Sequence, residues 1–218
     1  MSDLPPIESL QTRKNDPGQS RVVQSPAPAE LQADEVLFRL HRFALTTNNI
    51  TYAVFGDAMR YWDFFPTGDA EWGHMPVWGY GDVVASRAAG VEVGERFYGY
   101  FPMASHLRVK AASIKPAGFM DAAAHRQPLA AIYNLYSRCS ADEPAMPTRF
   151  EDAQLIVRPL FTTAFLCADF LQAQSCFGAR RIVISSASSK TAYASAYQLK
   201  AGAGVELVGL TSPANRAF

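Results

Sequence analysis

The sequence predicts an α/β protein with an N-terminal β-rich barrel and a C-terminal parallel strand–helix–strand unit, and three features indicate this. Short β-branched and aromatic runs separated by glycine-containing turns fill residues 77–109, as in a small barrel with bent strands. An apolar, Ala- and Leu-containing segment from 150 to about 173 is typical of helices. Residues 180–199 then have the pattern of strand, tight turn and helix, and residues 205–210 that of a second strand.

These patterns divide the chain of 218 residues into three parts. Residues 1–33 are polar and rich in proline, so we expect a flexible leader. Residues 34–149 are expected to form the barrel domain, and residues 150–218 the helical and parallel part. Because proline removes an amide and disfavours helix in the residue before it, one or two helices are expected around Pro159.

The composition excludes several classes of function. Twenty basic residues balance twenty acidic ones without a basic stripe, so we expect no nucleic-acid partner. No apolar run is long enough to span a bilayer, and the amino terminus lacks a secretory pattern, which predicts a cytoplasmic protein without a membrane partner. Three cysteines without C-x-x-C spacing predict reduced, mostly buried thiols: Cys139, Cys167 and Cys176.

The turn between the first parallel strand and its helix is the strongest candidate for ligand binding. Unpaired amides and the positive end of the helix dipole favour an anion there, such as a pyrophosphate. The side chains that would add donors are Ser186, Ser188, Ser189, Lys190 and Thr191. The G-x-G-x-x-G fingerprint is missing, however, since Ala187 and Tyr193 stand within the turn and where its last glycine would fall. Serine and threonine also cap helices, so phosphate binding and capping alone both stay open.

Four motifs occur in a fixed order along the chain: Asn49 in an early turn, the strand Gly79-x-Gly81-x-Val83-Val84, a Val-Gly-Glu-Arg turn within residues 90–99, and the late parallel unit. From about residue 35 to the end, this order resembles the medium-chain dehydrogenase/reductase superfamily. The chain looks like its zinc-free, quinone-oxidoreductase-like branch. Within that branch it is most similar to an uncharacterised domain family that carries a Ser-Ser-Ala-Ser-Ser-Lys-Thr-Ala turn.

The resemblance implies a GroES-like barrel, a partial Rossmann domain, and hydride transfer between NADPH and a small-molecule carbonyl or conjugated enone. Zinc-dependent relatives carry Gly-His-Glu where this chain has Gly79-Tyr80-Gly81, so no catalytic metal is expected. The family's dinucleotide domain continues through further strands beyond the equivalent of Phe218. Unpaired strand edges would favour a homo-oligomer.

Cofactor choice is predicted from the end of the second parallel strand, which meets the adenosine ribose in Rossmann folds. Residues 209–216 contain no carboxylate, which would select NAD. Ser212 and Arg216 would hold a 2'-phosphate by charge-assisted hydrogen bonds, and Thr211 lies in the same stretch. NADP is therefore the predicted cofactor, and a solvent-exposed turn is the alternative.

Reduction of an enone requires a donor for the developing enolate oxygen. Tyr52 is the first candidate, because it lies in the turn that faces the cleft in relatives, with Asn49 positioning it or the nicotinamide. Tyr80 and Tyr133 are weaker candidates, and tyrosines in an aromatic-rich barrel are more often packing residues. The alternative function is a non-catalytic or truncated family member that serves as a binding or interaction module.

Overall fold

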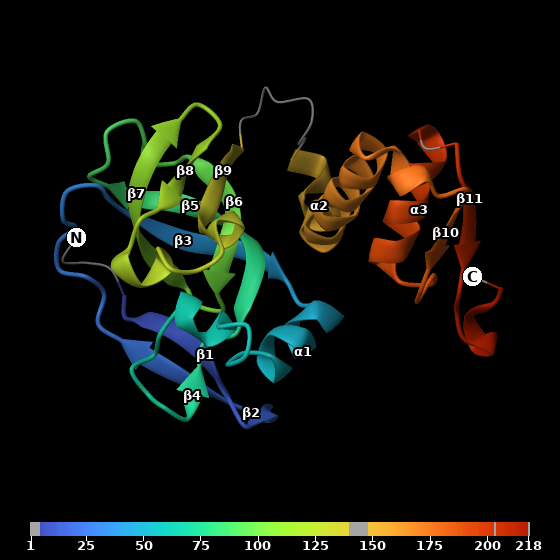
Figure 1. The fold of residues 1–218 in the computed structure, drawn as a ribbon. Helices are drawn as coiled ribbons and strands as arrows, with labels where there is room; N and C mark the ends of the chain where they lie inside the picture. The colour runs from blue at the N-terminus through green and yellow to red at the C-terminus, as the bar shows by residue number, and fades with distance from the viewer. Residues whose placement is uncertain (1–4, 140–147, 203, 218) are drawn as a thin grey trace. The chain divides into compact units, whose positions relative to one another are not determined.

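The computed structural model describes residues 5–139, 148–202 and 204–217. The chain forms two compact units, residues 1–151 and 152–218, and we describe each by itself. Figure 1 shows the elements of both units. The division falls two residues beyond the border expected from the sequence, which was placed after residue 149.

The predicted barrel is present in unit 1. Six strands close in the order β3-β5-β6-β9-β8-β7, and each neighbouring pair is antiparallel. Register shifts in β3 between Leu37 and Phe38 and again between Leu40 and Arg42 bend the strand, as closure of so small a barrel requires. The bounds are β3 (Glu35–Ala44), β5 (Pro76–Ser86), β6 (Arg96–Pro102), β7 (His106–Lys115), β8 (Gly118–Asp121) and β9 (Leu135–Cys139).

Aromatic rings fill the barrel interior. Phe38 is fully buried and lies 5.4–6.2 Å, centroid to centroid, from four other rings, those of Phe97, Phe101, Phe119 and Tyr136. These contacts join β3 to β6, β8 and β9, so one side chain links both halves of the barrel wall.

The prediction of a flexible leader over residues 1–33 is wrong for the larger part of that range. β1 (Ile7–Arg13) and β2 (Asp16–Ser25) form an antiparallel hairpin, and β4 (Trp72–Gly73) pairs with β1. A hydrogen bond of 2.8 Å from the Leu10 amide to the Met103 carbonyl connects the hairpin to the barrel. The polar composition was misleading because the buried residues of β1 are Gln11 and Thr12, and backbone pairing satisfies the strand.

Short helices complete unit 1. These are α1 (Thr47–Val54) and the 3-10 turns η1 (Tyr61–Phe64), η2 (Ala124–Arg126), η3 (Ala131–Asn134) and η4 (Thr148–Phe150). The early turn that carries Asn49 leads into α1, and Asn49 lies in the first turn of that helix.

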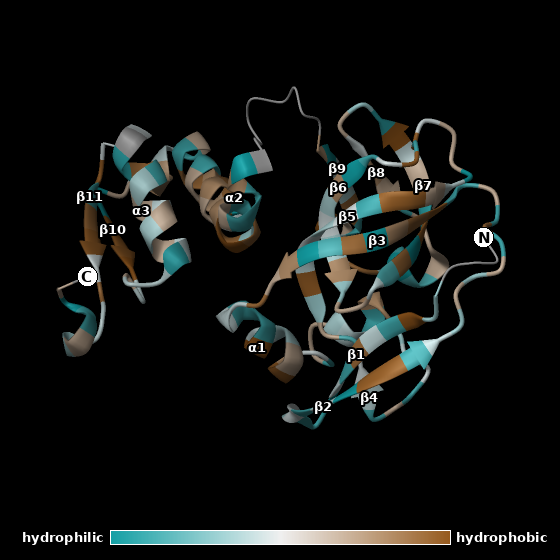
Figure 2. Ribbon diagram, turned by 180° about the vertical axis from the view of Figure 1, so that it is seen from behind, coloured by the Kyte–Doolittle hydropathy of each residue, from teal (hydrophilic) through white to brown (hydrophobic). Residues whose placement is uncertain are grey.

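Unit 2 contains the predicted strand–helix–strand unit. β10 (Arg181–Ile184) and β11 (Glu206–Gly209) are parallel, and α3 (Lys190–Gly202) joins them. Two further 3-10 turns are η5 (Ser175–Gly178) and η6 (Pro213–Asn215). Figure 2 shows both strands coloured as hydrophobic.

The long helix α2 (Glu151–Ala173) fills the segment in which one or two helices were expected, and it is a single helix. It is continuous through Pro159, because one missing amide is outweighed by the bonded turns on either side. In the described part of the chain, α2 is the one helix whose length and composition would allow it to cross a membrane. The sequence analysis found no such run because Arg158 and Asp169 interrupt the apolar residues.

The three cysteines form no disulfide bond in the described part of the chain, but they are not mostly buried as expected. Cys176 is buried, Cys139 is half-buried and Cys167 is exposed on α2. Cys167 is exposed because it lies on α2, whose apolar residues are themselves largely exposed.

Candidate functional site

The carboxyl ends of the two parallel strands lie at the same edge of their sheet. Ile184 is opposite Gly209, so the turn 185–189 and the segment 210–216 leave the sheet side by side. Two backbone hydrogen bonds of 2.9 Å join them, from the Leu210 amide to the Ile184 carbonyl and from the Ala187 amide to the Leu210 carbonyl. This is the edge at which open parallel sheets bind ligands.

The Ser188 hydroxyl connects the turn to the segment after β11. Its Oγ lies 3.1 Å from the Thr211 hydroxyl and accepts a hydrogen bond of 3.3 Å from the Asn215 side-chain amide. Ser188 and Thr211, predicted separately, are thus brought together. Asn215 was not predicted, although its place four residues after Thr211 on the same segment was a usable signal.

The start of α3 shows which donors are already engaged. The Ser189 hydroxyl accepts from the Ala192 amide at 3.2 Å, so the capping interpretation holds for Ser189. The amides of Lys190 and Thr191 have no partner among the residues that the structure describes. Ser186 has a φ of +48°, a conformation that favours glycine. The helix start therefore keeps two free amides beside an exposed Lys190 side chain.

The missing glycines of the turn have a structural counterpart on the neighbouring strand. A Cβ added to Gly209 would lie 2.8 Å from the Ala187 Cβ, closer than side chains pack. The close approach of turn and strand is thus made possible by a glycine on β11. The turn itself can carry Ala187 for that reason.

Ser212 and Arg216 are both exposed after β11. The Arg216 amide bonds to the Pro213 carbonyl at 3.3 Å, and its guanidinium has no ion pair in the described part of the chain. The segment 209–216 contains no carboxylate. Free amides, hydroxyls and two cations make a donor set that fits an anionic dinucleotide.

In unit 1, the Asn49 side chain is fully engaged in holding α1. Its Oδ1 accepts from the Thr46 amide at 2.7 Å, which completes a capping box, and its Nδ2 donates to the Pro76 carbonyl at 3.0 Å. Asn49 is 6% exposed. Its side chain therefore connects the helix start to β5.

Tyr52, one turn further along α1, lies in a second aromatic cluster. Its ring is 4.6 Å from the Tyr61 ring and 5.8 Å from the Tyr100 ring, and the Tyr61 and Tyr133 hydroxyls are 3.4 Å apart. Burial raises the pKa of Tyr52, of Tyr100 and of Tyr133. These phenols stay protonated near neutral pH, and as such they are hydrogen-bond donors.

Tyr80, a weaker candidate for the donor role, is 1% exposed in β5, with its ring 5.4 Å from that of Tyr98. Among the residues that the structure describes, no three His, Cys, Asp or Glu side chains gather as metal ligands would.

Comparison with known proteins gives a family and a fold. A family model described as "Protein of unknown function (DUF2855)" matches residues 43–218. No curated protein matches the chain.

Solved structures similar to the chain include a cyclopropanase, a quinone oxidoreductase and a protein complexed with NADPH. The CurF ER cyclopropanase from the curacin A biosynthetic pathway is 15% identical, with a TM-score of 0.54 over 98% of this chain and 56% of its own. The quinone oxidoreductase from Coxiella burnetii is 14% identical, with a TM-score of 0.51 over 98% and 59%. The mycobacterial Rv1454c complexed with NADPH is 14% identical, with a TM-score of 0.52 over 97% and 54%.

At these identities the likeness establishes the fold. The barrel and the parallel unit share the fold of these structures. The chain spans between half and three fifths of the length of these structures.

Proposed function

The chain belongs to the DUF2855 family, and we propose that it is a zinc-independent, NADPH-dependent oxidoreductase of the quinone or enone reductase type. Its fold is shared with reductases, among them one complexed with NADPH. This chain spans little more than half of those proteins. We therefore propose that it contributes to this activity. A cytoplasmic location remains part of the proposal.

One observation carries the proposal. The Ser188 hydroxyl joins the β10–α3 turn to Thr211 and Asn215 at the carboxyl edge of the parallel strands. The phosphate-binding turn and the ribose-binding segment of a dinucleotide site must lie together in this way.

The donors of unit 2 form two sets, one for the pyrophosphate of the cofactor and one for its 2'-phosphate. The free amides of Lys190 and Thr191 and the Lys190 ammonium would hold the pyrophosphate, with Ser186 and Ser188 at its side. Ser212 and Arg216 would hold the 2'-phosphate, and the absence of a carboxylate favours NADP over NAD. Bound NADPH supplies a hydride.

In unit 1 we assign the donor role to Tyr52. A neutral phenol held among apolar rings can donate a hydrogen bond to the oxygen of a carbonyl or enone and stabilise the charge that develops there. Asn49 is a positioning residue in this proposal, because it holds the turn of α1 that precedes Tyr52.

The test is a titration of NADPH and NADH into the chain, read by nucleotide fluorescence. We expect NADPH to bind, and Arg216→Ala to weaken it by about tenfold, the value of a charge-assisted hydrogen bond to phosphate. Arg180→Ala is the matched control, because Arg180 is exposed at the opposite end of β10. Equal NADPH affinity of both variants and the parent chain would contradict the assignment of Arg216.

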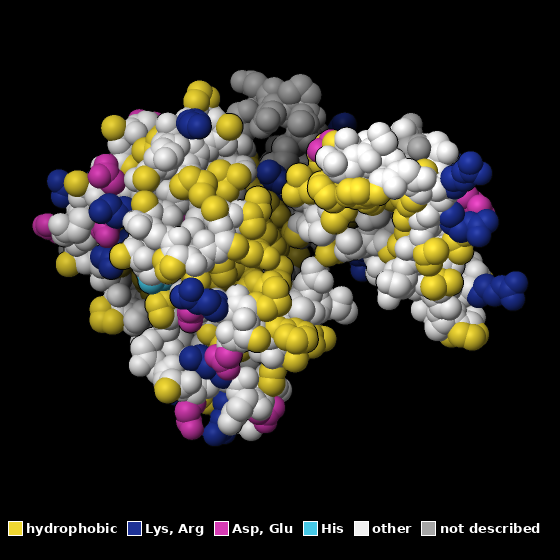
Figure 3. Space-filling model, in the orientation of Figure 1, with side chains coloured by type: hydrophobic (Ala, Val, Ile, Leu, Met, Phe, Trp, Pro, Cys, Tyr) yellow, Lys and Arg dark blue, Asp and Glu magenta, His cyan; other side chains and the backbone are white. Residues whose placement is uncertain are grey.

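A second candidate is a non-catalytic interaction module that associates with a further copy of this chain. Its support is the apolar surface of unit 2, where Figure 3 shows hydrophobic side chains gathered over α2. Six of them are 38–57% exposed: Ile156, Val157, Phe161, Phe165, Leu166 and Phe170. Light scattering of the purified chain tests it, since a monomer opposes this candidate. NADPH oxidation with an enone, abolished by Tyr52→Phe, would remove it.

A further inference from the structure

A cavity in unit 1 has no part in the proposed reductase site. It has a volume of about 310 Å³ and is lined by the β1–β2 connection, η1 and the loop before β5: Lys14, Trp62, Asp63, Pro66, Thr67, Gly68, Asp69, Ala70, Trp72 and Gly73. We propose that it binds a small organic carboxylate, whose anionic group pairs with Lys14 and whose planar apolar part lies against Trp62.

The loop that forms one wall is held in shape before any ligand arrives. The Thr67 hydroxyl donates to the Trp72 carbonyl at 2.6 Å and accepts from the Asp69 amide at 3.0 Å. The Asp69 carboxylate in turn accepts from the Glu71 amide at 2.9 Å. A wall with this many internal bonds loses little conformational freedom on binding.

The charges around the cavity leave one cation unmatched. Asp63 pairs with Arg60 at 2.8 Å, and Asp69 pairs with Arg21 at 2.9 Å. Both carboxylates of the lining are therefore neutralised from outside it. Lys14 is half-buried and has no ion pair in the described part of the chain.

Two backbone groups add to this anion preference. The amides of Gly68 and Ala70, which also line the cavity, have no hydrogen-bond partner among the described residues. A carboxylate accepts hydrogen bonds from an ammonium group and from free backbone amides.

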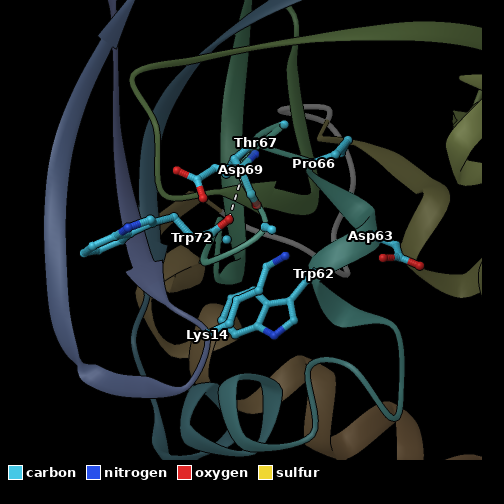
Figure 4. A pocket seen from close by; sticks show the side chains of 10 residues that line it. Lys14, Trp62, Asp63, Pro66, Thr67, Asp69 and Trp72 are labelled. Atoms are coloured by element: carbon cyan, nitrogen blue, oxygen red, sulfur yellow. Dashed lines mark hydrogen bonds between the residues drawn. The ribbon is translucent and has the colours of Figure 1, made fainter.

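The opposite wall is apolar and planar. Trp62 is 4% exposed, and its ring packs so closely on Gly73 that an added Cβ there would lie 2.4 Å from Cε3. Figure 4 shows the Lys14 side chain directed toward the loop of Thr67 and Asp69, and the Trp62 nitrogen on the side away from that loop. The cavity therefore meets the carbon side of the indole rather than its nitrogen, which suits an apolar group.

The volume limits the ligand to a small molecule, because it lies at the lower end of ligand pockets. Lys14 lies on the connection between β1 and β2, so the cavity depends on that hairpin. An effector or a second substrate with a carboxylate would bind there.

Benzoate is the probe for the experiment, titrated into the whole chain and followed by the backbone amide resonances of residues 67–73 and by tryptophan fluorescence. We expect saturable shifts confined to this loop. Lys14→Met should weaken benzoate at least tenfold, the loss of one charge-assisted contact. Lys110→Met, an exposed lysine on β7, is the matched control and should bind as the parent chain does.

The parent chain provides a second measurement that needs no variant. Benzyl alcohol keeps the ring but lacks the charge, so we expect it to bind at least tenfold more weakly than benzoate. The proposal is overturned if benzoate produces no saturable shift in residues 67–73, if benzyl alcohol binds equally well, or if a folded Lys14→Met variant binds benzoate as tightly as the parent.

Discussion

Replacing Asn49 by alanine separates the structural role of this residue from a role at the nicotinamide. The substitution removes the acceptor for the Thr46 amide and the donor for the Pro76 carbonyl. Pro102, opposite Pro76 in β6, has no amide hydrogen that could replace that donor. We therefore expect Asn49→Ala to destabilise unit 1.

The size of the effect follows from the two bonds. Loss of the capping interaction costs about 1 kcal/mol. Leaving a buried carbonyl without a partner costs about 1–3 kcal/mol more. The expected decrease in the free energy of unfolding is therefore about 2–4 kcal/mol.

Urea unfolding followed by tryptophan fluorescence and circular dichroism measures this decrease. Asn48→Ala is the matched control. The Asn48 side chain is half-buried and makes no hydrogen bond in the described part of the chain, and its backbone amide, which bonds to the Thr46 hydroxyl, is kept in the variant, so a change below about 0.5 kcal/mol is expected. The reasoning fails if Asn49→Ala is as stable as Asn48→Ala. A stable Asn49→Ala variant that had lost enone reduction would show instead that Asn49 acts at the cofactor.

Three further predictions concern packing and pH. Phe38→Ala should cost about 3–5 kcal/mol in urea unfolding, against under about 1 kcal/mol for the partly exposed Phe43→Ala on the same strand; equal losses would contradict the proposed core. Gly209→Ala should destabilise unit 2 by about 1–3 kcal/mol, and Ala187→Gly in the same chain should restore much of the loss, which thermal melts of single and double variants would show. Burial lowers the pKa of His74 below its ordinary 6.5, so the unfolded chain takes up the proton at a higher pH than the folded chain does. The stability that is present above about pH 6.5 is therefore lost as the pH falls. The urea midpoints at pH 7.5 and pH 5.0 should differ more for the parent chain than for His74→Gln, and equal differences would refute this.

Local patterns were sufficient for much of the fold. The parallel unit was predicted because β-branched runs before and after an Ala-rich segment are a signal within some 30 residues. The barrel was predicted because glycine-containing turns separate its β-rich runs. The resemblance added the order of the domains, and the fold of known reductases agrees with it.

The hairpin was missed, because it depends on partners elsewhere in the chain. β1 carries Gln11 and Thr12 on its buried side, and backbone pairing with β2 and β4 stabilises it. The number of polar residues in a segment does not predict whether its backbone pairs with another strand. The cavity beside Lys14 was invisible for the same reason, since its walls come from segments some 50 residues apart.

The candidate site divides along the same line. The sequence by itself determined which residue types stand at the start of α3 and after β11, because those are local features. Only the tertiary structure decided that Ser188 meets Thr211 and Asn215, and that Gly209 supplies the close approach that the turn lacks. It also decided that the Asn49 side chain is engaged with Thr46 and Pro76. Distances between residues far apart in the chain are set by packing, and packing is a property of the whole fold.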